Sequence, residues 1–86
     1  MAWKIKYSAA ALKALRRLDP PIQRRILSFI ETRVASRPRR IGEALKGRFG
    51  EYWKYRVGDY RLICDIGDAT RTVLVLQIGD RKEVYR

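Results

Sequence analysis

Three cationic side chains lie within one short segment of the sequence, residues 54–61, which reads KYRVGDYR. Its Gly58-Asp59 pair predicts a two-residue hairpin turn. With that turn, Arg56 lies directly opposite Arg61 on the neighbouring strand. Lys54 emerges on the same face, because side chains two residues apart in a strand share a face. The hairpin is therefore expected to present all three cations side by side.

Such a cluster of cations is suited to binding phosphate. Like charges directly opposite each other destabilise a sheet, by up to roughly 1 kcal/mol, and a face that is merely solvated more often pairs Arg with Glu or Thr. Guanidinium groups bind phosphate oxygens through paired hydrogen bonds. We interpret the hairpin as a phosphate-binding site, and the alternative is an ordinary basic sheet face in a very basic protein.

The opposite face of the same hairpin is apolar and is expected to lie in the core. Cys64 belongs to this face, which predicts a buried and unreactive thiol. The face comprises Trp53, Tyr55, Val57, Tyr60, Leu62 and Cys64.

The composition argues against several classes of protein. With 86 residues, the chain is expected to form a single domain, residues 1–86. It has no histidine and one cysteine, which argues against a zinc site, a histidine general base and a disulfide framework. No metal or cofactor is expected. The lone cysteine and the lack of a recognisable signal peptide or membrane span favour a cytoplasmic protein with no membrane partner.

The charge balance points to a polyanionic partner. Lys and Arg number 20 and Asp and Glu number 9, which gives a net charge of +11. The cations are spread along the chain rather than confined to a tail. A folded body with a basic surface is expected to bind nucleic acid, a ribosome or an acidic protein.

The hydrophobic periodicity predicts an α+β fold with the element order β-α-α-β-β-β. Residues 3–7 alternate as a strand, and Ser8 is expected to cap the helix that follows. A second helix is predicted from Pro20 to about Val34, and then a basic connector over 35–47 that could hold one helical turn. Three strands are predicted at 49–57, 60–66 and 72–79, the last of them central and covered on both sides. The expected result is a small, mostly antiparallel sheet with a helical hairpin packed on one face.

Further basic residues lie outside the hairpin, in the connector and at the end of the chain. Residues 37–40 carry three arginines, for which contact with ribosomal RNA and a solvated loop are equally open interpretations. Residues 81–85 carry two cations and a tyrosine, and Arg81 shares a side with Gln77 if strand alternation continues. The predicted RNA-binding or ribosome-binding residues are Arg37, Arg39, Arg40, Lys46, Arg48 and Lys82.

Several strings in the sequence resemble the RelE toxins of bacterial and archaeal toxin–antitoxin pairs. The strings are YWKYRVGDYRLICDI, VLVLQIGDRKEVY and ALKALRRLDPPIQRRI. The run EALKGRFGEYWKYRVGDYR fits the family pattern L-x-G followed by W-[KR]-x-[RK]-x-G-x-YR. The resemblance covers the whole chain and implies the RelE fold, while RVGDYR is shared with the wider RelE/ParE superfamily.

The resemblance implies a ribosome-dependent endoribonuclease that cuts messenger RNA in the decoding site. Its catalytic residues, carried over by motif, are Lys54, Arg56, Arg61, Arg81 and Tyr85. It also implies neutralisation by a cognate acidic antitoxin, with a monomeric free toxin and a higher-order complex. Other ribonuclease members have a histidine beside the tyrosine, where this chain has Val84, which favours the histidine-free RelE type.

Two questions stay open from the sequence. The base that takes the 2′-OH proton is Tyr85 or Lys54, since neighbouring cations lower the pKa of both a phenol and an ammonium group. The function is a nuclease, a ParE-like inhibitor of DNA gyrase without nuclease activity, or an inactive basic binding module.

Overall fold

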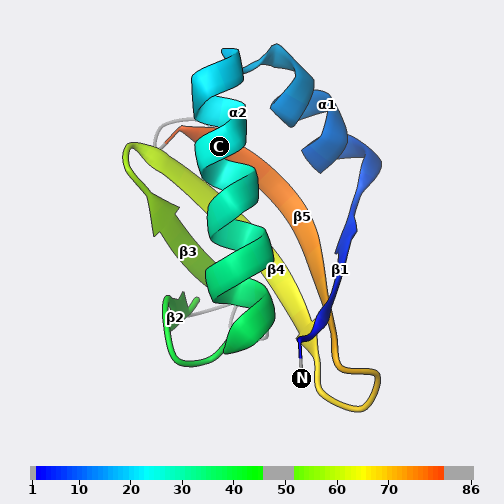
Figure 1. Ribbon diagram of the computed structural model, residues 1–86. Coiled ribbons are helices and arrows are strands. Elements are labelled where there is room, and N and C mark those ends of the chain that lie inside the picture. The colour runs from blue at the N-terminus through cyan, green and yellow to red at the C-terminus, as the bar shows by residue number, and fades with distance from the viewer. Residues whose placement is uncertain (1, 46–51, 81–86) are drawn as a thin grey trace.

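The computed structural model describes residues 2–45 and 52–80 of the chain. Two helices and a five-stranded sheet form an α+β fold in two layers (Figure 1). In chain order the elements are β1 (Lys4–Tyr7), α1 (Ala9–Arg17), α2 (Pro20–Phe29), the π-helical turn η1 (Ile30–Val34), β2 (Glu43–Ala44), β3 (Trp53–Val57), β4 (Tyr60–Gly67) and β5 (Thr72–Asp80).

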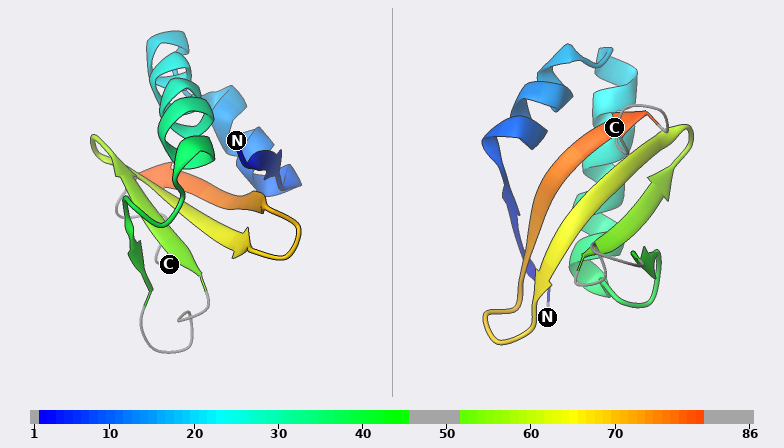
Figure 2. Two further views of the ribbon diagram at one scale, coloured as in Figure 1. Left: turned by 60° about the horizontal axis from the view of Figure 1, so that its bottom comes forward. Right: turned by 180° about the vertical axis from the view of Figure 1, so that it is seen from behind.

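The strands lie in the order β1-β5-β4-β3-β2. β1 is parallel to β5, and the other three pairs are antiparallel. Both helices lie over one face of this sheet, and the view from behind shows the other face without a helix (Figure 2). The predicted architecture, a mostly antiparallel sheet with a helical hairpin on one face, is confirmed.

The helices begin where the sequence predicts. The Ser8 hydroxyl accepts a hydrogen bond from the Ala11 amide at 3.0 Å, which caps α1, and donates one to the Leu76 carbonyl at 2.7 Å. Ser8 therefore caps the helix and also joins its start to β5. Asp19 occupies the N-cap position of α2 and Pro20 its first turn.

The core lies between the two helices and the covered face of β3, β4 and β5. Ile26 and Ile30 on the helical side are fully buried, as are Tyr55 and Leu62 on the sheet. Cys64 is fully buried among them, as predicted, and burial raises the pKa of its thiol to about 12. A thiol held in that state is a packing group rather than a nucleophile.

The hairpin that carries the cations has the predicted register. Val57 pairs with Tyr60, Arg56 with Arg61, and Lys54 with Ile63. Gly58 has φ +60°, a left-handed conformation that glycine adopts without strain, as expected at the first position of such a turn.

Two predictions about the sheet need correction. The connector after the second helix was expected to hold at most one helical turn. Instead, its described part beyond residue 36 contains no helix and has a two-residue edge strand, β2, that pairs with β3, which was not predicted because two residues carry no periodicity. The last strand, β5, does lie inside the sheet between β1 and β4, but the described helices cover only one of its faces. On the other face Gln77 is exposed and Leu74 is half-buried.

Candidate nucleic-acid interface

The three hairpin cations lie on the face of the sheet that the helices leave open. Arg61, which pairs with Arg56 on one side, pairs with Gly79 of β5 on the other. Lys54 lies two residues before Arg56 on β3, about 7 Å away along the strand. Because Tyr55 between them points into the core, both cations point away from the helices. The predicted cluster therefore exists as one surface, referred to below as the cationic face and defined by Lys54, Arg56 and Arg61.

Arg61 is the most enclosed of the three cations, with 8% of its surface exposed. Its Nη1 donates hydrogen bonds to the carbonyl of Gly58 at 3.3 Å and to that of Tyr60 at 3.2 Å. These contacts keep the guanidinium against the hairpin, so it is held in place before any ligand arrives.

Lys54 forms an ion pair with a carboxylate on the neighbouring strand. Its Nζ lies 3.0 Å from Oε1 of Glu43 on the edge strand β2, and Glu43 and Lys54 are paired in the sheet. The Lys54 side chain is 24% exposed, whereas the Glu43 side chain is 70% exposed. Glu43 is therefore the more exposed partner, and the sequence alone did not predict this ion pair.

Arg56 is the exposed member of the cationic face. It pairs directly with Arg61 on the neighbouring strand β4. Two guanidinium groups on directly paired positions repel each other, and they attract any anion that lies between them. The cationic face thus combines an enclosed arginine, an exposed arginine and a lysine paired with a carboxylate.

Two more lysines share this open face and were not predicted to do so. Lys4 pairs with Thr72 and Lys6 with Leu74, while the residues between them, such as Ile5, pack against the core. Alternation in the sequence already placed Lys4 and Lys6 on one side of their strand. Only the pairing of β1 with β5 shows that this side is also the side of the cationic face.

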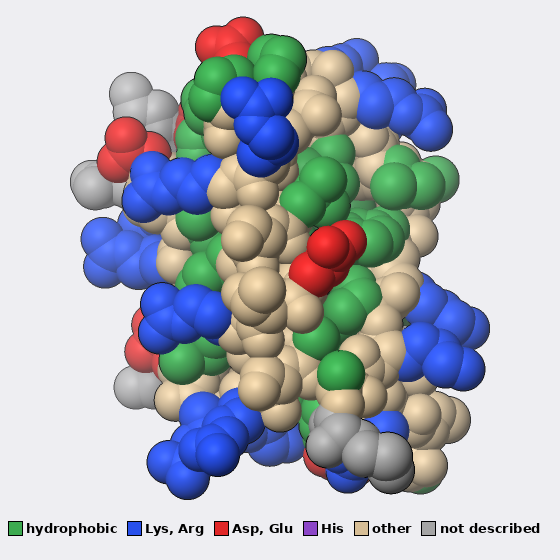
Figure 3. Space-filling view, in the orientation of Figure 1, with side chains coloured by type: hydrophobic (Ala, Val, Ile, Leu, Met, Phe, Trp, Pro, Cys, Tyr) green, Lys and Arg blue, Asp and Glu red, His purple; other side chains and the backbone are tan. Residues whose placement is uncertain are grey.

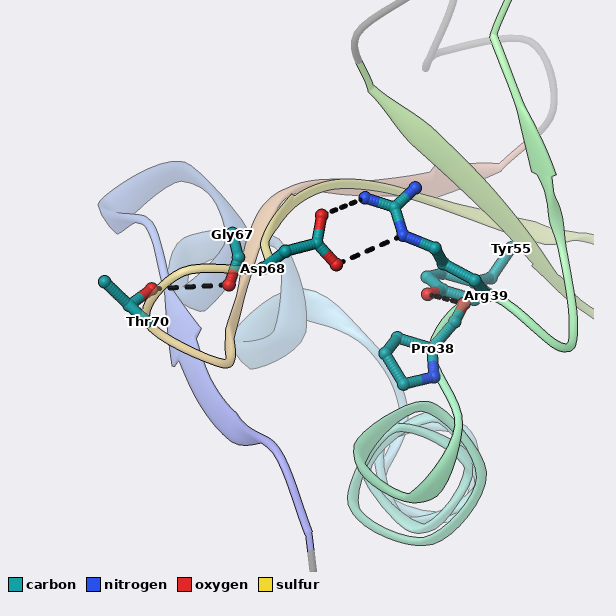
Figure 4. Close-up of polar contacts among 6 residues, drawn as sticks. All are labelled: Pro38, Arg39, Tyr55, Gly67, Asp68 and Thr70. Carbon is teal, nitrogen blue, oxygen red and sulfur yellow. Dashed lines mark hydrogen bonds and ion pairs between the residues drawn. The ribbon is translucent and has the colours of Figure 1, made fainter.

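Arg39, predicted to contact RNA, is already engaged within the protein. Its guanidinium binds the Asp68 carboxylate with Nη2–Oδ2 at 2.6 Å and Nε–Oδ1 at 3.4 Å (Figure 4). The guanidinium carbon also lies 5.4 Å from the ring centre of Trp53. The hydrogen bond from Arg39 lowers the pKa of the Asp68 carboxyl, and the same bond raises the pKa of Arg39. The pair ties the connector to the turn between β4 and β5.

The other predicted site residues divide into two groups. Arg37 and Arg40 are exposed on the connector, next to Pro38, whose carbonyl accepts a 2.6 Å hydrogen bond from the buried Tyr55 hydroxyl (Figure 4). The remaining predicted residues lie outside the described part of the chain: Lys46, Arg48, Arg81, Lys82 and Tyr85.

Positive charge alone does not mark the site, because basic side chains also surround the opposite side of the molecule. Figure 3 shows Lys and Arg side chains along both borders of the helix-covered side, with hydrophobic side chains between them. The cationic face differs in that its charges lie on paired strands at fixed spacing. A rigid sheet holds them at the separations that its register sets.

Other kinds of site find no support in residues 2–45 and 52–80. Within those ranges no group of three or more His, Cys, Asp or Glu side chains comes together to hold a metal ion. No helix there is long and apolar enough to cross a membrane. Among the described side chains, burial raises the pKa of the Tyr55 phenol, and its hydroxyl donates to Pro38, so it is unsuited to act as a base.

Comparison with known proteins connects this geometry to a family. The family described as the ParE toxin of the type II toxin–antitoxin system parDE matches residues 5–85. The toxin RelG of Mycobacterium tuberculosis is 28% identical over 86 residues, which is all of this chain and 99% of that protein.

Solved structures agree with this match. The toxin–antitoxin complex RelBE2 of M. tuberculosis contains a chain with a TM-score of 0.89 and 25% identity, covering 96% of this chain and 95% of that one. The isolated RelE toxin of E. coli matches with a TM-score of 0.79 and 26% identity, over 98% of this chain and 92% of the toxin. The fold described above is thus that of proteins named as toxins of toxin–antitoxin pairs.

Proposed function

This chain belongs to the ParE toxin family of type II toxin–antitoxin systems, and from that premise we propose that it is a ribosome-dependent endoribonuclease. It is a type II toxin of the RelE/ParE superfamily, and its relatives by sequence include toxins named RelG and RelE. The proposal concerns the reaction: cleavage of messenger RNA in the decoding site of the ribosome, without a metal ion or cofactor.

The observation that carries this proposal is the cationic face itself. An inhibitor that only binds another protein has no need of two arginines on directly paired positions, an arrangement that weakens the sheet. A phosphodiester passing through the transition state gains negative charge, and fixed guanidinium groups stabilise that charge. In this proposal Arg61 and Arg56, which are paired across the two strands, contact the same phosphate.

The reaction we propose is attack by the RNA's own 2′-oxygen on the adjacent phosphorus. A base takes the 2′-OH proton, the bond from phosphorus to the 5′-oxygen breaks, and the leaving oxygen takes up a proton. The products are a 2′,3′-cyclic phosphate and a 5′-hydroxyl. In this proposal the base is Tyr85 or Lys54, and Arg81 assists the leaving group. The ribosome contributes by holding the RNA in line for attack.

We further propose that an acidic antitoxin neutralises the toxin. Solved complexes of similar chains include RelBE2 of M. tuberculosis, and the net charge of +11 favours an acidic partner. Opposite charges accelerate encounter, and salt screens them. Association with the antitoxin is therefore expected to slow as salt rises, and a rate that is independent of salt would remove the electrostatic part of this proposal.

The experiment that tests the proposed reaction is single-turnover cleavage of messenger RNA on programmed ribosomes. Wild-type protein should cut within the codon in the decoding site, and a 2′-deoxynucleotide at that position should block the cut because the nucleophile is gone. Removing the general base typically costs about 10²–10⁴ in rate. Tyr85→Phe should show that loss if Tyr85 is the base, and Lys54→Met should show it if Lys54 is.

A second candidate function is inhibition of DNA gyrase, which the name of the matching family favours. If the chain is a ParE-type toxin, we expect it to act on gyrase without cutting RNA. Induction of the toxin separates the two activities: cuts mapped within translated codons support the nuclease, and supercoiling defects without cuts support the gyrase inhibitor. If neither is seen, the chain is an inactive binding module.

A further inference from the structure

The edge strand β2 is held in one position by side chains of β3. The Tyr55 hydroxyl donates to the Pro38 carbonyl at 2.6 Å, and the Trp53 indole Nε1 donates to the Ile41 carbonyl at 2.8 Å. Beyond the strand, the Leu45 amide donates to the Tyr52 carbonyl at 3.0 Å. The connector is thus hydrogen bonded to β3 before β2 and to the residue preceding β3 after it, and β2 itself pairs with β3.

Gly42 completes this attachment, because only a glycine fits there. Its φ is +73°, and a Cβ at this position would overlap the Lys54 carbonyl oxygen and lie 2.8 Å from Trp53 Nε1. The backbone of the connector therefore lies directly against β3. The residue that follows, Glu43, is placed beside Lys54 by this contact and by the sheet pairing.

The ion pair between Glu43 and Lys54 adds little to stability. The Glu43 side chain is 70% exposed, and exposed ion pairs are worth little to folding. The contact does restrict a lysine, whose long side chain otherwise samples many rotamers. The contacts that attach β2 to β3 fix the backbone of Glu43 beside Lys54, so the ion pair draws the ammonium toward this side of the cationic face.

We propose that Glu43 is a positioning residue that orients the Lys54 ammonium on the cationic face for the RNA phosphate. This inference rests on the proposed nuclease function. The carboxylate lies 3.0 Å from the Lys54 ammonium, so it influences where this side chain lies on the cationic face, whether Lys54 or Tyr85 takes the 2′-OH proton. Glu43 acts through Lys54 and does not itself touch the reacting atoms.

A competing account treats Glu43 only as a negative charge beside an RNA-binding surface. In that account, its removal should tighten RNA binding and leave the rate of the bound complex unchanged or faster. Positioning predicts the opposite for the rate. Loss of the carboxylate removes one restraint on the Lys54 side chain, so the cleavage step within the bound complex slows even though the overall charge is more favourable for binding.

The test is single-turnover cleavage on programmed ribosomes, with the saturating rate and the half-saturating concentration measured separately. Glu43→Gln should lower the saturating rate about two- to fivefold, the factor expected for an exposed ion pair. Glu43→Lys should lower it at least as much, because two adjacent cations repel, while the half-saturating concentration falls. Partial unfolding lowers the concentration of active protein, so it would not lower the half-saturating concentration. It therefore cannot explain a variant in which the saturating rate and the half-saturating concentration both fall.

Asp65→Asn is the matched control. Asp65 is exposed on the open face of the sheet, opposite Leu74, and its change removes the same charge without altering the partner of Lys54. Its saturating rate should equal that of the wild type. In the Lys54→Met background Glu43→Gln should have no further effect, since the group that it orients is gone.

The outcomes separate this inference from the function on which it rests. If wild-type protein cleaves and Glu43→Gln matches Asp65→Asn in rate, the positioning role is wrong and the nuclease stands. The positioning role is also wrong if Glu43→Gln slows the Lys54→Met variant as much as the wild type. If wild-type protein does not cleave at all, the proposed function fails and takes this inference with it.

Discussion

The two faces of the β3–β4 hairpin have opposite effects on folding. Toward the helices, Tyr55 and Leu62 are fully buried, and the one polar atom that Tyr55 brings into the core is hydrogen bonded to Pro38. Toward the open side, Arg56 and Arg61 are paired like charges. Every contact of the inner face favours folding, whereas the arginine pair of the outer face opposes it.

This difference indicates what each face is for. Burial of apolar side chains is the main source of folding free energy, so the inner face stabilises the sheet. The outer face uses that stability to keep two like charges on directly paired positions, where we propose that an RNA phosphate binds. Neighbouring residues on the same strand should therefore respond to substitution in different ways, and the following changes test that division.

The largest effect is expected on the inner face, for Leu62→Ala. Leu62 is fully buried between the sheet and the helices, and its truncation leaves a cavity that costs roughly 2–5 kcal/mol of folding free energy. Equilibrium unfolding in urea measures this loss. The exposed Leu12, which is 39% accessible on α1, is the matched control, and Leu12→Ala should cost far less. Equal losses at the two positions would contradict the assigned core.

The adjacent residue, on the outer face, should affect activity instead. Arg61→Ala removes a fixed guanidinium, and loss of one such transition-state contact typically slows the chemical step about 10²–10³-fold. The urea midpoint should change little. Arg24→Ala, on the solvent side of α2, makes the same change in charge and should cleave at the wild-type rate. If both variants lose activity equally, net charge rather than the cationic face determines the rate.

An intermediate effect is expected for Tyr55→Phe, which keeps the ring and removes the hydroxyl bonded to Pro38. Leaving a buried carbonyl without its donor costs about 1–3 kcal/mol, again measured by urea unfolding. The variant should also weaken the attachment of the connector.

The same substitution should alter the dependence of stability on alkaline pH. Burial raises the pKa of the Tyr55 phenol above its ordinary value of 10, and that of the Cys64 thiol to about 12. The unfolded chain thus releases these protons at lower pH than the folded protein does. The stabilising contribution is complete below about pH 9 and declines as the pH rises. Tyr55→Phe should make this decline shallower, and an unchanged decline would exclude Tyr55 as its source.

The smallest effect should be a gain in stability, for Arg56→Thr. Threonine keeps a good strand former at an exposed position and removes one member of the like-charged pair, which should stabilise the fold by roughly 0.2–1 kcal/mol. Cleavage should fall at the same time. Thermal unfolding at low and at high salt measures the first effect, and the gain should shrink at high salt because ions screen the repulsion. A loss of stability at low salt would show that the pair is not repulsive.

The sequence alone determined whatever depends on neighbours along the chain. The register of the β3–β4 hairpin follows from the two-residue turn at Gly58-Asp59, and alternation then places Lys54, Arg56 and Arg61 on one face. The same local rules predicted the cap at Ser8 and the buried position of Cys64. The turn, the alternation and the cap involve residues close in sequence, so the types of residue and their spacing are sufficient to predict them. Cys64 was assigned to the core because the same alternation places it on the apolar face of the hairpin.

Only the tertiary structure decided which distant segments meet. Glu43 reaches Lys54 because β2 is fastened to β3, Arg39 reaches Asp68 across 29 positions of the chain, and Lys4 shares the open face because β1 lies parallel to β5. A two-residue strand has no periodicity to recognise, and an arginine in a basic connector resembles every other arginine there. Such pairings form because the whole sheet packs against its helices. The free energy of that packing comes from residues far apart in the chain, so no local pattern in the sequence predicts it.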